Sequence, residues 1–171
     1  MDIFQIILRI VHVFAAVYWV GAATFFQLVI QPALQSAGSA GQQAQSKIAT
    51  SPAFAASMAA AAVLTTLAGI ILYLRWTNGL DMNVIGTGPG IVFGIGGLAG
   101  IAAFVVSAFV ISPISAQLSR LSQQAAGGPP APETLAQIQG LAARVQQMSR
   151  IALALMLIAL FGMAIARYVT F

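Results

Sequence analysis

Cysteine is absent from the 171 residues of this chain, and charged residues make up only 6% of it. The missing cysteines exclude disulfides, thiolate metal sites and covalently attached c-type haem. Because 60% of the residues are hydrophobic, so few charges are too few to cover a globular surface of this size. We therefore expect an integral membrane protein whose main partner is the lipid bilayer.

Several catalytic signatures are missing as well. No Asp or Glu lies inside a long apolar run, which argues against a proton relay built from carboxylates. The sequence contains no phosphate-binding loop, nucleotide fingerprint or Ser/His/Asp set, and this disfavours a hydrolase or a kinase. The seven Lys and Arg residues are scattered singly, so the positive charge does not indicate nucleic-acid binding.

What the sequence does contain is four long apolar runs. Each is long enough to cross a bilayer, and backbone groups inside hydrocarbon must be satisfied within a helix. The sequence thus predicts an all-α integral membrane four-helix bundle that forms a single domain over residues 1–171. The expected spans are about residues 3–30, 53–75, 90–112 and 149–168.

Two similar halves are visible in this pattern. The stretch Val29-Ile-Gln-Pro-Ala-Leu-Gln35 resembles Val110-Ile-Ser-Pro-Ile-Ser-Ala-Gln117, and the second and fourth runs end alike, at Leu74-Arg-Trp-Thr77 and Ala166-Arg-Tyr-Val-Thr170. These similarities predict a duplicated helical hairpin.

Residues between the spans predict helical extensions on one side of the membrane. The third span is expected to continue to about Ala125, and a linker at 127–132 precedes an amphipathic helix from Glu133 to Met148 that runs into the fourth span. The long loops hold four of the seven basic residues. This bias favours a bacterial inner-membrane protein with these loops in the cytoplasm and both termini on the outer, periplasmic side. The four are Lys47, Arg120, Arg144 and Arg150, against Arg9, Arg75 and Arg167.

The single histidine, His12, lies inside the first span, roughly 14 Å from its start. It belongs to a stripe on one helical face that lipid would reject, so an ionisable residue there is a candidate functional site. A haem b with His12 as its iron ligand fits this placement, because Arg9 and Gln5 lie nearer the surface and can meet its carboxylates. The alternative is a structural hydrogen bond from His12 to a carbonyl or to Thr65 or Thr66. The stripe comprises Gln5, Arg9, His12, Ala16, Trp19, Ala23 and Gln27.

Glycines are concentrated in the third span. Gly90, Gly94 and Gly97 share one helical face at the expected depth of His12, so they are candidates to lie against a cofactor ring. Close helix packing is the alternative for such spacing. Trp19, near mid-membrane, either packs or lines the same site.

A haem with two protein ligands needs a second side chain besides His12. Met163 on the fourth span is the candidate metal ligand at the same end of the bundle, and Met156 lies deeper. Two other arrangements stay open, namely a five-coordinate iron and a homodimer in which two copies of His12 share one haem.

The pattern His12-x6-Trp19-x-Gly21, followed by Phe25-Phe26 and Gln31-Pro32-Ala33-Leu34, resembles the first helix of small bacterial membrane proteins. These include the copper-resistance D-type family and the HemJ-type, haem-associated four-span membrane family. The resemblance implies haem binding or copper handling, and it carries over His12, Trp19 and Gly21.

The leading hypothesis is a membrane protein that binds haem b through His12 for electron transfer or haem handling. The principal alternative is a non-catalytic accessory subunit of a larger membrane complex. Copper or small-solute transport is a third hypothesis.

Overall fold

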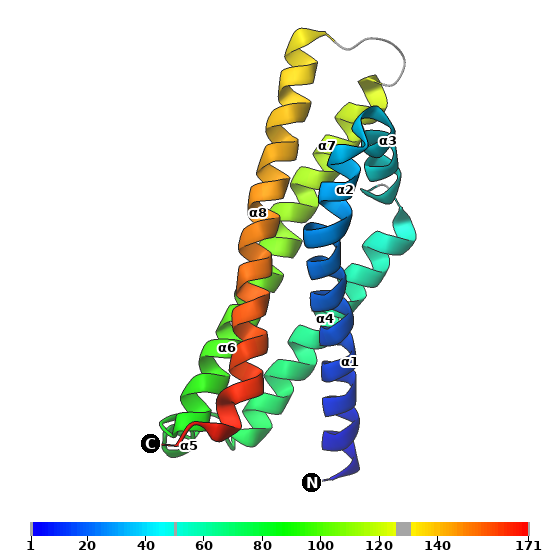
Figure 1. The fold of residues 1–171 in the computed structure, drawn as a ribbon. Helices are drawn as coiled ribbons and strands as arrows, with labels where there is room; N and C mark the ends of the chain where they lie inside the picture. Colours follow the sequence, from blue (N-terminus) through cyan, green and yellow to red (C-terminus); the bar gives the residue numbers. More distant parts are fainter. Residues whose placement is uncertain (1, 50, 126–130, 171) are drawn as a thin grey trace.

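The computed structural model describes residues 2–49, 51–125 and 131–170. The chain forms a bundle of four long helical segments, and both termini lie at the same end (Figure 1). Each of the four is long and apolar enough to cross a membrane. The predicted all-α multi-pass membrane fold is therefore confirmed. The segments are Ile3–Ser36, Pro52–Trp76, Gly88–Ala125 and Pro132–Tyr168.

The first segment comprises three helical elements, and a further short helix follows it. Asp2 caps α1 by accepting a hydrogen bond from the Gln5 backbone N–H, and Pro32 lies in the first turn of α2. The elements are α1 (Ile3–Phe25), the π-helical η1 (Phe26–Ile30), α2 (Gln31–Ser36) and α3 (Gly38–Ala49).

The remaining elements complete the bundle. The longest is α8. Its 34 residues run without a break from the amphipathic extension beyond the membrane into the fourth span, as predicted. The predicted continuation of the third span to Ala125 is also confirmed, whereas part of the predicted 127–132 linker lies outside the described residues. The elements are α4 (Pro52–Trp76), α5 (Met82–Ile85), α6 (Gly88–Val105), η2 (Val106–Ile111), α7 (Ser112–Ala125), α8 (Pro132–Ile165) and η3 (Ala166–Tyr168).

Two helical hairpins make up the bundle: α1 packs most closely on α4, and α6 most closely on α8. Each hairpin contains a π-helical turn just before a proline at the end opposite the termini. The N–H of Gln31 bonds to the carbonyl of Phe26, and the N–H of Ser112 bonds to that of Ser107. Proline has no N–H and its ring clashes with the carbonyl four residues earlier, which explains why the preceding turn widens.

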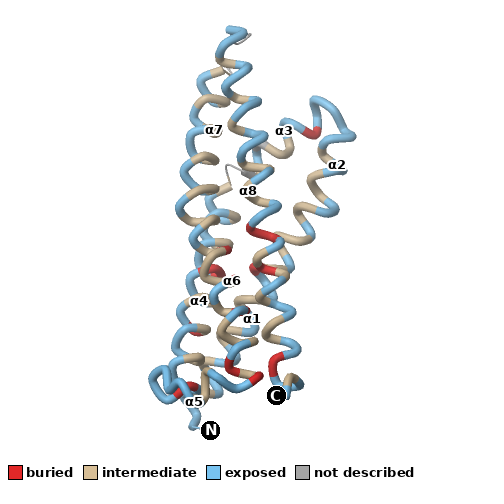
Figure 2. Tube along the Cα trace, turned by 90° about the vertical axis from the view of Figure 1, so that its left-hand side faces the viewer, coloured by how far each residue is buried: buried red, intermediate tan, exposed pale blue. Residues whose placement is uncertain are grey.

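The core is narrow and built around Trp19, which is 4% exposed. Its indole is surrounded by small residues that let the helix backbones approach, and the buried positions lie along the inside of the bundle (Figure 2). Many large apolar side chains along the spans are exposed instead, as a lipid-facing surface requires. The buried core cluster is Trp19, Ala61, Ala62, Ala103, Ala152 and Met156.

Candidate functional site

His12 is held in one orientation by helix α4. Its Nδ1 lies 2.8 Å from the backbone carbonyl oxygen of Thr65. A carbonyl can only accept, so Nδ1 carries the proton and donates this bond. In the neutral ring, Nε2 then holds the lone pair. The half-buried imidazole is therefore in the tautomer in which Nε2 can bind a metal.

Gly69 has no side chain, and this lets the His12 imidazole pack closely against α4. A Cβ added at Gly69 would lie 2.8 Å from Cε1 and 3.1 Å from Nδ1 of His12. Any larger residue would push the ring out of place, so the close approach requires glycine here. Sequence reasoning identified Thr65 but missed Gly69, although the spacing of four residues places both on one face of α4.

The register between α1 and α8 brings Met163 to the same level as His12. Across these antiparallel helices, the side-chain amide of Gln27 donates to the Ser149 carbonyl over 2.8 Å, and Trp19 and Met156 share the core cluster. His12 lies seven residues from Trp19 toward the termini, and Met163 lies seven from Met156 in the same direction. Seven residues make about two helical turns, so both keep the faces of Trp19 and Met156.

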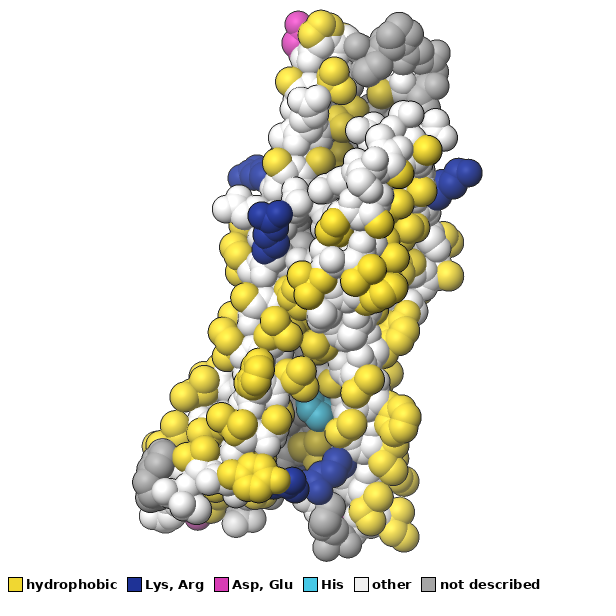
Figure 3. Space-filling view, in the orientation of Figure 1, with side chains coloured by type: hydrophobic (Ala, Val, Ile, Leu, Met, Phe, Trp, Pro, Cys, Tyr) yellow, Lys and Arg dark blue, Asp and Glu magenta, His cyan; other side chains and the backbone are white. Residues whose placement is uncertain are grey.

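A hollow separates α1 from α8 at this level. The two helices diverge toward the end that holds the termini (Figure 1), and Figure 3 shows the histidine inside the hollow between them, with basic side chains just below it. Met156 is buried in the core at 4% exposure, whereas Met163 is only partly buried. Of the two methionines, Met163 is therefore the less enclosed one, and its side chain lining the hollow stays a prediction.

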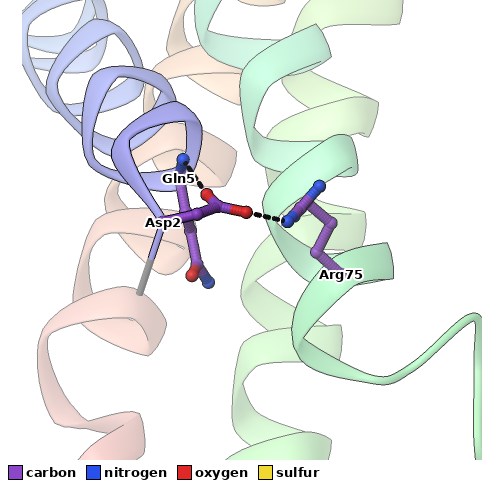
Figure 4. A network of polar contacts seen from close by, with 3 residues as sticks. All are labelled: Asp2, Gln5 and Arg75. Atoms are coloured by element: carbon purple, nitrogen blue, oxygen red, sulfur yellow. Dashed lines mark hydrogen bonds and ion pairs between the residues drawn. The ribbon is translucent and has the colours of Figure 1, made fainter.

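The mouth of the hollow carries positive charge. Arg9 is exposed, and within the described part of the chain it has no hydrogen-bond or ion-pair partner. Arg75 is occupied, because its guanidinium lies 2.6 Å from a carboxylate oxygen of Asp2 (Figure 4) and 5.4 Å above the Phe4 ring. Gln5 is half-buried, and its backbone N–H donates to Asp2 over 2.7 Å. Arg9 is thus a cation available for an anionic group, and Arg167 at the same end contacts only the neutral Tyr168 side chain.

The three candidate glycines of α6 lie in different surroundings. A Cβ at Gly90 would collide with the Val84 carbonyl at 2.3 Å, and one at Gly94 would touch the Tyr73 hydroxyl at 3.0 Å. A Cβ at Gly97 would meet open space. His12 is not among the nearest atoms of any of the three, so their contact with a cofactor ring stays a prediction.

Two polar groups near His12 lack partners. Within the described residues, the buried hydroxyls of Thr65 and Thr66 have no hydrogen-bond acceptor or donor. Such groups are costly in an apolar interior unless something satisfies them. They leave two unsatisfied hydroxyls on the part of α4 that contacts His12.

No protein-family model, curated protein or solved structure matches the chain. Among the described residues, no three His, Cys, Asp or Glu side chains are grouped where they could hold a metal ion. A metal at His12 would therefore need Met163 or a cofactor to complete its ligands.

Proposed function

We propose that this protein binds a haem b in the hollow between α1 and α8, with the Nε2 atom of His12 as the iron ligand. The observation that carries the proposal is the 2.8 Å hydrogen bond from Nδ1 to the Thr65 carbonyl. A metal-binding histidine almost always donates its other ring N–H in this way, which fixes the ring and raises its basicity.

The other parts of the site have matching roles. Met163, at the level of His12 on the opposite helix, would supply a thioether sulfur as the second ligand. Arg9 lies one turn nearer the surface than His12, where its guanidinium can pair with a carboxylate of the macrocycle. The resident haem would supply one-electron chemistry, and the apolar walls would keep water away from it. The role is electron transfer or haem handling.

The same charge bias supports an orientation. The end of the bundle opposite the termini, with α7 and the first half of α8, holds four of the basic residues and one acidic residue, Glu133. We propose that this end faces the cytoplasm of a bacterial cell and that the termini face the periplasm. The haem site would then lie in the outer half of the inner membrane.

A second candidate function rests on the same hydrogen bond. Because the bond joins α1 to α4, His12 would also serve a non-catalytic accessory subunit as a polar contact between helices. The two functions differ in what copurifies with the protein from its native membrane. Haem identifies the first, and partner proteins without haem identify the second.

The test is an absorption spectrum of protein purified from its native membrane, oxidised and then reduced with dithionite. We expect the α band of a b-type haem in the difference spectrum. His12→Ala should remove it while the bundle stays folded by circular dichroism. Met163→Ala should retain haem but alter the position of the α band.

The matched control is Tyr18→Phe, which removes the 2.8 Å hydrogen bond from the Tyr18 hydroxyl to the Ser57 hydroxyl, another contact between α1 and α4. It should keep the full haem content. A featureless visible spectrum of the wild type, or unchanged haem in His12→Ala, would contradict the proposal.

A further inference from the structure

A second site lies at the other end of the bundle, between the first helical segment and α8. It is a cleft of about 400 Å³, and η1 and α2, which continue α1, form one of its walls. The other wall is a single face of α8. The lining residues are Gln27, Leu28, Gln31, Pro32, Gln35, Gln146, Arg150, Leu153, Ala154 and Leu157.

The cleft is polar at one end and apolar at the other. Gln31, Gln35 and Gln146 line the outer end, where the apolar spans finish. Leu153, Ala154 and Leu157 continue the same face of α8 into the membrane span. The cleft therefore crosses the boundary between headgroups and hydrocarbon, and a ligand that fills it must be an amphiphile.

Arg150 determines the charge of that amphiphile. Its side chain is exposed at the cleft and has no ion-pair or hydrogen-bond partner among the described residues. The one acidic residue of this end, Glu133, lies 17 residues earlier on α8, which is about 25 Å along the helix. At physiological ionic strength this distance is well beyond the screening length of about 8 Å. The cleft is consequently electropositive.

The surrounding glutamines suit a phosphate group. Each side-chain amide offers two N–H donors, and Gln31, Gln35 and Gln146 can direct theirs to acceptor oxygens beside a guanidinium. The amide of Gln27 is already engaged with the Ser149 carbonyl and closes the site toward the core. Donors without a neighbouring carboxylate favour an anionic oxygen headgroup over a neutral or zwitterionic one.

We propose that this cleft binds an anionic phospholipid of the surrounding leaflet. Its phosphate lies against Arg150 and the glutamines, and one acyl chain follows Leu153, Ala154 and Leu157 into the membrane. The lipid covers the gap between the two hairpins on this side and steadies the junction of η1, α2 and α8. This site is separate from His12 and does not depend on the haem proposal.

The experiment is native mass spectrometry of delipidated full-length protein to which phosphatidylglycerol or phosphatidylcholine is added in equal amounts. We expect one phosphatidylglycerol to remain bound and little phosphatidylcholine. Arg150→Gln should weaken phosphatidylglycerol binding about tenfold, the loss expected from one charge-assisted hydrogen bond. Ala154→Phe, which fills the apolar end and keeps the charge, should weaken it as well.

The matched control is Arg144→Gln, which removes an exposed positive charge of the same helix outside the cleft. Its affinity should equal that of the wild type. Equal binding of both lipids, or equal losses in Arg144→Gln and Arg150→Gln, would overturn the proposal. Tighter Arg150-dependent binding of oleate than of phosphatidylglycerol would overturn it in favour of a free fatty acid.

Discussion

Replacing Gly69 by alanine tests the geometry of the His12 site most directly. The new Cβ would lie 2.8 Å from Cε1 of His12, whereas ordinary contacts begin at 3.4 Å. The ring must therefore retreat by about 0.6 Å. A shift of that size away from α4 stretches the 2.8 Å bond to the Thr65 carbonyl beyond the usual limit of about 3.2 Å.

The effect on stability should be small because two terms oppose each other. Losing the hydrogen bond costs about 0.5–1.5 kcal/mol, and interhelical bonds inside membranes average about 0.6 kcal/mol. Replacing a helical glycine by alanine returns about 0.5–1 kcal/mol. We therefore expect Gly69→Ala to change the free energy of unfolding by less than about 1 kcal/mol while disturbing His12.

The assay is ¹⁵N solid-state NMR of histidine-labelled protein in lipid bilayers. Since His12 is the only histidine, the spectrum reports a single ring. The wild type without haem should show a protonated Nδ1 and an unprotonated Nε2. Gly69→Ala should shift the Nδ1 resonance or mix the tautomers, and Gly21→Ala, whose Cβ meets nothing within 4 Å, should not. A protonated Nε2 in the wild type would refute the reasoning.

Two further predictions concern the scaffold. Gly162→Leu should lower the free energy of unfolding by about 1–3 kcal/mol through overpacking, because a Cβ at Gly162 lies 3.1 Å from the Gly96 Cα. Gly97→Leu, whose Cβ meets open space, should change the free energy of unfolding little. An SDS-unfolding titration measures both. Both side chains of the Asp2–Arg75 ion pair are about half exposed. The pair should therefore contribute at most about 1 kcal/mol to stability in a double-mutant cycle with Asp2→Asn and Arg75→Gln. A larger coupling energy would show that the pair is shielded from water.

The sequence was sufficient to predict the spans and the outer extensions, since both depend on composition and periodicity alone. The continuity of α8 followed from an apolar stripe that continues through Val145 and Met148 up to the fourth apolar run. A hydrogen bond from His12 to a carbonyl or to Thr65 or Thr66 was also predicted, as the alternative to a ligand site, and the structure has the bond to the Thr65 carbonyl. Such features are local, so one chain carries their full signal.

Other features depend on how the helices meet, and no single segment encodes them. The close contact between Gly69 and the His12 ring exists only because α1 packs on α4 at that residue. The sequence alone drew attention to the more numerous glycines of α6 instead. The same holds for Gly162, whose partner Gly96 lies on the opposite helix. The register between the first segment and α8 likewise shows only in the contact from Gln27 to the Ser149 carbonyl, which no single segment encodes.

The two hairpins differ at the position of His12. A shift of 81 residues, from Val29 to Val110, superimposes the two prolines and their π-helical turns. It also places Phe93 at the position of His12, and Phe93 packs edge-on against Trp76 at 5.4 Å between ring centroids. At this offset the second hairpin carries an apolar residue where the first has an imidazole. The polar bond of His12 to the Thr65 carbonyl is therefore particular to the first hairpin and is not part of what the two hairpins share.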